Sequence, residues 1–184
     1  MEILKSLQLL GRKGVSDMNA MLLLVQRLSC DVEEQIYSEV SLALENPEAY
    51  FEKFKDRLDE RGIDSPINQL AWISLVDALL DHDLAFEIDW KESGLYLCDV
   101  VDELLDRKEM ACISWEDFED GEFDELPTSQ YLNEISKRLS EKGISLACLD
   151  MESDCYVLIT VPSTDINEIK ALAREAGYRI QDSF

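Results

Sequence analysis

The sequence predicts an α+β protein in which an N-terminal helical part packs on a small mixed sheet. Helix-capping residues recur along residues 1–80, and an alternation of apolar and polar residues with period two follows at 84–90. The C-terminal third has the order α-β-β-α-β, which is typical of helices layered on a sheet. Since 46% of the 184 residues are hydrophobic, the chain is long and apolar enough to bury a core of its own.

Capping residues mark the starts of three helices in the N-terminal part. The spacing of Asp31 and Glu34 matches a capping box and predicts the first start. Asn46-Pro47 and Ser65-Pro66 each place a polar cap before a proline, which predicts a further start at both positions. The third helix is apolar nearly all round, so we expect it to be the most buried one. Its only polar residues are Asn68, Gln69, Ser74 and Asp77.

The middle of the chain changes from helix to strand and back. Residues 84–90 have the pattern of a half-buried strand, and residues 95–106 have the period of an amphipathic helix. Residues 116–125 hold seven acids around Gly121 and are expected to form an exposed acidic loop or linker. We therefore expect a mainly helical part at residues 1–115 and an α-β-β-α-β part at 126–184, either as two units or as one integrated domain.

The C-terminal third carries clear helix and strand signals. Thr128 should cap a helix that Gly143 ends, and Ser163 or Thr164 should cap a second helix that Gly177 ends. A continuous apolar run between these helices predicts a strand that is buried on both faces. The expected elements are a helix at 128–143, strands at 144–149 and 155–161, a helix ending at 177 and a final short strand from Tyr178.

The charge is strongly negative and unevenly distributed. The chain has 40 Asp and Glu against 17 Lys and Arg, a net charge of −23, and 17 of those acids with only 3 bases lie between Asp81 and Glu125. Direct nucleic-acid binding needs clustered Lys and Arg, which are absent, and an anionic membrane surface would repel this chain. The apolar content is too high for a disordered acidic tail.

Compartment signals predict a cytoplasmic protein with reduced thiols. The N-terminus lacks the basic region of a secretory signal, and its longest apolar run, Ala20–Val25, is too short to cross a bilayer. The five cysteines include no C-x-x-C pair, so neither a disulfide framework nor a zinc site is expected. Cys148 and Cys155 are expected to face each other across the predicted hairpin as core thiols.

Four carboxylates share one face of the helix at 95–106. Asp99, Asp102, Glu103 and Asp106 stand at i, i+3, i+4 and i+7, opposite an apolar stripe. Like charges at i, i+4 cost about 0.2–0.5 kcal/mol per pair. A divalent cation or a basic partner would offset that cost, whereas an exposed, solvated face would simply tolerate it.

The acidic segment at 116–125 is the second candidate. A calcium loop that begins at Glu116 would place Phe118 and Pro127 where ligand oxygens are required, so this interpretation fails. Recognition of a basic surface and a solvated loop both remain open. Asp150, Glu152 and Asp154 are expected to be ordinary turn residues. The candidate acids of the segment are Glu116, Asp117, Glu119, Asp120, Glu122, Asp124 and Glu125.

Two regions of the chain resemble a bacterial family of domains of unknown function. The first is LAWISLVDALL at residues 70–80 with AFEIDWK at 85–91, and the second is LDMESDCYVL at 149–158 with A-x-x-A-G-Y at 173–178. The similarity covers roughly residues 66–180, apart from the acidic segment. It implies a cytosolic bacterial α+β protein without an assigned activity, and it supplies no catalytic residue.

These observations favour a non-enzymatic cytosolic binding or regulatory protein that uses its acidic surface to engage a basic protein, without a cofactor. The alternative is a divalent-metal-dependent hydrolase that uses Asp99, Asp102 and Glu103, together with Asp77. A third interpretation is that the charge serves only solubility. Whether the carboxylates converge on one point or spread into solvent distinguishes the first two, and the oligomeric state is not predicted.

Overall fold

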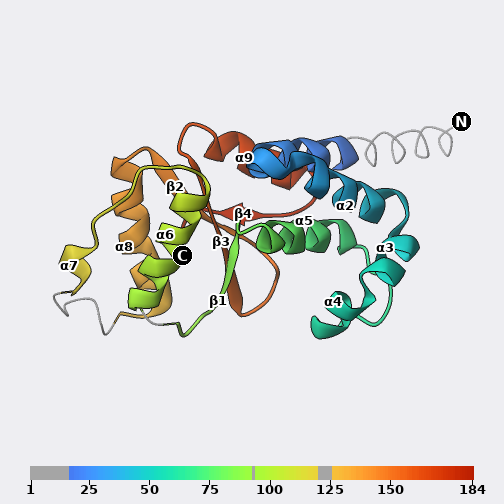
Figure 1. Cartoon of the computed structure of the whole chain (residues 1–184), viewed down its shortest axis with the longest axis horizontal. Helices are drawn as coiled ribbons and strands as arrows, with labels where there is room; N and C mark the ends of the chain where they lie inside the picture. The colour runs from blue at the N-terminus through green and yellow to red at the C-terminus, as the bar shows by residue number, and fades with distance from the viewer. Residues whose placement is uncertain (1–16, 93, 120–125) are drawn as a thin grey trace, which may run out of the picture. The chain divides into compact units, whose positions relative to one another are not determined.

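The computed structural model describes residues 17–92, 94–119 and 126–184, without the side chains of Asp117 and Glu119. The chain divides into two compact units. Figure 1 shows how its described helices and strands follow one another along the chain. Unit 1 contains the described residues up to Ala78 together with Ala171–Tyr178, and unit 2 contains those of Leu79–Lys170 and Arg179–Phe184. Helices and an antiparallel sheet confirm the α+β class.

Unit 1 is built from helices. Residues 17–28 are helical. They are followed by η1 (Cys30–Val32), α2 (Glu33–Glu45), α3 (Pro47–Lys53), α4 (Lys55–Glu60) and the start of α5 (Leu70–Asp81), and α9 (Ile166–Glu175) returns to this unit at Ala171.

Helix α5 is the most apolar segment, as predicted. Every residue from Leu70 to Leu79 is buried, because the helix is apolar nearly all round and has no solvent face to present.

The three predicted helix starts differ in outcome. At α3 the expected cap is confirmed, because the Asn46 carboxamide accepts a hydrogen bond from the Ala49 N–H at 3.1 Å. The predicted capping box is wrong. Residues 30–32 form a 3₁₀ turn, and α2 begins after Val32, whose side chain makes no capping hydrogen bond. The start at Ser65-Pro66 is also wrong, because a turn closed by Leu70 N–H and Ile67 O delays α5.

The end of α9 is confirmed at Gly177. This residue has φ +90°, a conformation that costs glycine nothing. Its N–H donates to Arg174 O, and the Tyr178 N–H donates to Ala173 O at 2.8 Å. These two bonds form a Schellman motif, which satisfies the last carbonyls of the helix and reverses the chain.

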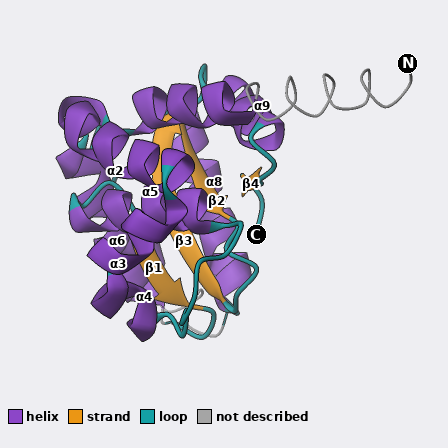
Figure 2. Ribbon diagram, turned by 90° about the vertical axis from the view of Figure 1, so that its right-hand side faces the viewer, coloured by secondary structure: helices purple, strands orange, loops and turns teal. Residues whose placement is uncertain are grey.

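Unit 2 contains a four-stranded sheet in the order β1-β3-β2-β4 (Figure 2). Its strands are β1 (Phe86–Asp89), β2 (Ile144–Leu149), β3 (Cys155–Pro162) and β4 (Ile180–Gln181). All neighbouring strands are antiparallel, so the expectation of a mixed sheet is wrong. After β3, the chain passes through α9 and returns to the sheet on the far side of β2. Strand β4 therefore pairs with β2 and never touches β3, to which it runs parallel.

The strand register corrects two further expectations. Cys148 lies opposite Leu158, whereas Cys155 pairs with Asp89 of β1, so the two thiols do not face each other. All five cysteines are free thiols. Strand β1 ends at Asp89, and Trp90 is 50% exposed rather than part of a half-buried strand face.

Two helices pack on this sheet. Helix α6 (Gly94–Arg107) contacts β3, and α8 (Thr128–Glu141) contacts β2 and α6. Thr128 is the first residue of α8 rather than its cap, and its hydroxyl instead donates to Glu92 O at 3.1 Å. The shared core contains Val101, Leu104, Leu132, Ile135, Leu146 and Leu158.

We predict that Gly94→Ala destabilises unit 2. A Cβ atom at Gly94 would lie 2.0 Å from Cε2 of the buried Tyr131 ring. Overpacking of this kind costs about 1–3 kcal/mol in the free energy of unfolding, which urea denaturation measures. Tyr131→Leu removes the clashing ring, so the two substitutions together should cost less than the sum of their separate effects. Strict additivity would contradict the proposed clash.

Candidate functional site

The four predicted carboxylates of α6 share one exposed face. Asp99, Asp102, Glu103 and Asp106 are all exposed. The opposite face is buried in the core of unit 2 and consists of Leu97, Cys98, Val100, Val101, Leu104 and Leu105. The spacing in the sequence therefore correctly predicted which side of this helix faces water.

Trp115, directly before the acidic segment 116–125, is hydrogen-bonded to this face of α6. Trp115 Nε1 donates a hydrogen bond to Asp102 Oδ2 at 2.8 Å. Glu116, which follows Trp115 and is exposed, begins the short helix α7 (Glu116–Glu119). The structure thus links Trp115, the residue directly before the first acid of the segment, to an α6 carboxylate. We call Asp99, Asp102, Glu103, Asp106 and Glu116 the α6 acidic surface.

Phe118 anchors α7 in the core of unit 2. Its side chain is fully buried, and its ring lies 5.6 Å from that of Trp115 in an edge-on arrangement and 4.9 Å from that of Tyr131. The Arg138 guanidinium lies over the same ring at 4.0 Å. Residues 116–119 are therefore not the start of an exposed loop, because an aromatic side chain among the acids is buried.

The other predicted acids of the segment cannot be placed on this surface. Asp120, Glu122, Asp124 and Glu125 lie outside the described residues, and the side chains of Asp117 and Glu119 are likewise outside them.

Burial raises the pKa of Asp102. The desolvation by neighbouring protein is the main cause, and the negative charge of Asp99 adds to it, while the hydrogen bond from Trp115 acts in the opposite direction. The charged form of Asp102 is thus held beside a like charge and is stabilised by a donor from a different segment.

Two exposed apolar side chains extend the surface toward the start of α6. Leu95 is 52% exposed and Tyr96 is 43% exposed. Tyr96 precedes Asp99 by three residues and Glu103 by seven, so these side chains lie along one side of the helix. Neither Leu95 nor Tyr96 was predicted as a site residue. The available signal was that both fall on the polar side of an otherwise regular helical pattern.

Asp77, the further acid of the hydrolase alternative, is held in an ion cluster of unit 1. It is 3% exposed, and its carboxylate lies 2.5 Å from Arg61 Nη2 and 3.2 Å from Arg57 Nε. Arg57 also binds Glu39 and donates to the Tyr50 hydroxyl at 2.8 Å. The carboxylate is therefore engaged by guanidinium groups, which makes it a poor metal ligand.

The remaining acids do not form a metal centre either. Across residues 17–92, 94–119 and 126–184, no group of three or more His, Cys, Asp or Glu could hold a metal ion. Asp150 caps its own turn, because its Oδ1 accepts from the Glu152 N–H at 2.9 Å. Such a bond is typical of a turn aspartate and agrees with the expectation for Asp150-x-Glu152-x-Asp154.

Comparison with known proteins identifies the family. A family model described as "Domain of unknown function (DUF6630)" matches residues 20–184, and the chain therefore belongs to that family. This confirms the resemblance to a family of domains of unknown function. No curated protein and no solved structure matches the chain. In the described part of the chain, no helix is both long and apolar enough to cross a bilayer.

We predict a pH-dependent gain in stability from Asp102→Asn. The folded state raises the pKa of Asp102 above the usual 3.8, so the stability contribution of this carboxyl is present below that pH and is lost as the pH rises through the raised value. The asparagine keeps an acceptor for Trp115 and does not ionise. Urea unfolding at several pH values from about 3.5 to 6 should show a growing advantage over the wild type.

The matched control for this prediction is Asp106→Asn. It removes the same charge one turn further along α6, but it leaves the single indole N–H of Trp115 bound to Asp102. An equal pH-dependent gain in both variants would attribute the effect to general repulsion and contradict a specific role for the burial of Asp102.

We further predict that Mg²⁺, Mn²⁺ or Ca²⁺ at millimolar concentration raises the melting temperature no more than NaCl of matched ionic strength. Exposed carboxylates that spread into solvent gain only ionic screening from such ions. A saturable rise of several degrees with one metal alone would instead indicate a preformed site and favour the hydrolase alternative.

Proposed function

We propose that this DUF6630 protein is a non-enzymatic binding or regulatory protein of the bacterial cytoplasm, and that its α6 acidic surface engages a basic protein. The observation that carries the proposal is the hydrogen bond between Trp115 and Asp102, which links the residue before Glu116 to the exposed acidic face of α6. Nucleic acid is not the expected partner, because the chain is too acidic to neutralise phosphate.

The physical basis of the proposal is electrostatic complementarity with an apolar contact beside it. Exposed carboxylates on a rigid helix attract a basic partner over several ångströms and accelerate its association. Leu95 and Tyr96 supply apolar area at the edge of the same surface. Because exposed ion pairs contribute little affinity each, the aromatic side chain is expected to contribute most to slow dissociation.

No observation favours the hydrolase alternative over this proposal, since Asp77 is engaged by two arginines and the α6 carboxylates are exposed. The third interpretation, in which the charge serves only solubility, predicts no partner at all. One experiment separates it from the proposal.

We predict that neutralising four of the five acids of the α6 acidic surface strongly reduces capture of basic partners while the fold survives. The variant Asp99→Asn/Glu103→Gln/Asp106→Asn/Glu116→Gln leaves the bond between Trp115 and Asp102 intact. The tagged wild-type chain should retrieve basic proteins from cell lysate at low salt and lose them at high salt, as quantitative mass spectrometry measures. Association with a purified captured partner should slow about tenfold in the variant.

The matched control is Glu45→Gln/Glu52→Gln/Asp59→Asn/Glu60→Gln, which removes four exposed acids from unit 1. It should retain capture. Tyr96→Ala should accelerate dissociation without changing the salt dependence. Capture of the same proteins at the same level by both fourfold variants would contradict the proposal and leave solubility as the role of the charge.

A further inference from the structure

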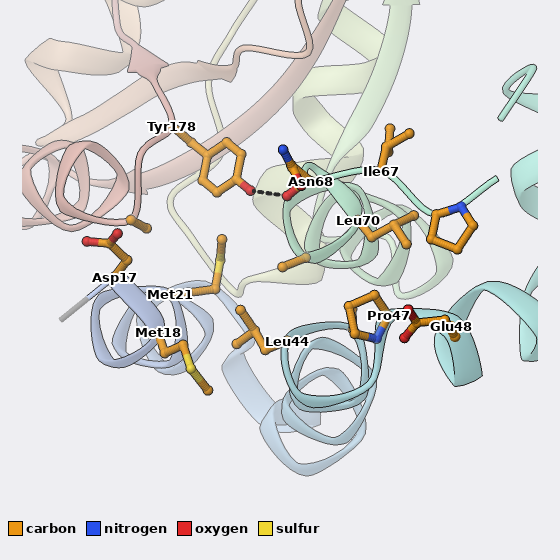
Figure 3. A pocket seen from close by; sticks show the side chains of 14 residues that line it. Asp17, Met18, Met21, Leu44, Pro47, Glu48, Ile67, Asn68, Leu70 and Tyr178 are labelled. Atoms are coloured by element: carbon orange, nitrogen blue, oxygen red, sulfur yellow. Dashed lines mark hydrogen bonds between the residues drawn. The ribbon is translucent and has the colours of Figure 1, made fainter. Parts of the chain in front are cut away.

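Unit 1 contains a pocket of about 410 Å³. Figure 3 shows the side chains that line it, which come from the helix at residues 17–28, from α2, α3 and α5, and from the turn after α9. The buried part of its wall is apolar and consists of Met21, Ala43, Leu70 and Ala71. A volume of this size is typical of sites for small molecules.

Tyr178 forms a rigid wall of the pocket. Its ring stacks on that of Trp72 with the centroids 4.7 Å apart and an angle of 5° between the planes. Its hydroxyl donates to Asn68 O at 3.4 Å, as the dashed line in Figure 3 marks. Burial raises the pKa of Tyr178, so the phenol stays neutral near pH 7. The wall is thus ordered before any ligand arrives, which lowers the entropic cost of binding.

The two regions that carry the family resemblance both contribute to this pocket. Leu70 and Ala71 line it at the start of α5, and Trp72 supports the ring of Tyr178. Ala176 and Tyr178 line it from the other region, positioned by the turn at Gly177. Segments about one hundred residues apart in the sequence therefore line the same cavity.

The charged groups at the pocket are all acidic. Among the described residues that line it, Asp17 and Glu48 carry charge, and none is Lys, Arg or His. In the view of Figure 3, these two carboxylates lie on opposite sides of the pocket, with Met21 and Leu44 between them. A ligand that matches this arrangement has a positive charge at each end and an apolar middle.

We propose that this pocket binds a linear aliphatic diamine, the simplest member of the polyamine class. One ammonium group would pair with Asp17 and the other with Glu48 through charge-assisted hydrogen bonds. The methylene chain between them would cover the apolar wall formed by Met21 and Leu44. This site lies in unit 1 and is independent of the α6 acidic surface.

Isothermal titration calorimetry with α,ω-diaminoalkanes of four to eight carbons tests the proposal at physiological salt. We expect saturable binding of one diamine per chain, with an optimum chain length at which both ends reach a carboxylate. The monoamine and the diol of the same length should bind about tenfold more weakly or not at all, because each lacks one or both charges.

Three variants make the test specific. Asp17→Asn/Glu48→Gln should weaken the best diamine about tenfold, and Ala71→Leu should abolish binding by filling the pocket. Glu45→Gln/Glu52→Gln removes two exposed acids from the same helices, α2 and α3, and should leave the affinity unchanged. Circular dichroism confirms that each variant is folded. Equal weakening in the control pair, equal binding of the diol, or no saturable binding would overturn the proposal.

Discussion

A shortage of positive charge constrains this structure more than any other property. With 17 basic side chains for 40 acidic ones, most carboxylates have no cation inside the chain, so the fold has to leave them in water. Among the described residues, Asp77 is the one carboxylate that is buried, and two guanidinium groups contact it. A buried charge without such partners would cost several kcal/mol. Apart from Asp77, the buried side chains described in both units are accordingly neutral.

The few cations of unit 1 are used where helices meet. Arg57 of α4 contacts Asp77 of α5, Glu39 of α2 and the Tyr50 hydroxyl of α3, and its guanidinium stacks on Phe54 at 4.4 Å. One side chain therefore joins four helices. Burial raises the pKa of Tyr50, which keeps its hydroxyl neutral and able to accept from Arg57. A lysine could not replace this arginine, since its single ammonium group lacks the planar set of donors.

The sequence predicted the features that depend on local spacing and missed those that depend on tertiary pairing. The cap at Asn46, the burial of α5 and the polar face of α6 follow from residues within one or two turns of each other. The register of Cys148 and Cys155 does not, because β3 pairs with both β1 and β2, and β1 is distant from this hairpin in the sequence. Phe118 was overlooked for a related reason. The density of acids around it suggested exposure to solvent, whereas its ring is buried and holds residues 116–119 against the core of unit 2.

The same shortage connects the two proposed binding surfaces. In unit 2, Lys108 donates to Thr160 O at 2.7 Å and Arg107 donates to His82 O at 3.0 Å, so two cations at the end of α6 bind backbone carbonyls. In unit 1, Arg57 and Arg61 are directed to Asp77 and do not line the pocket. Positive charge on another molecule would complement the acids of either surface. Long-range attraction of this kind weakens with added salt, whereas the internal contacts of the buried arginines are screened much less, so binding should be lost at salt concentrations that leave the fold intact.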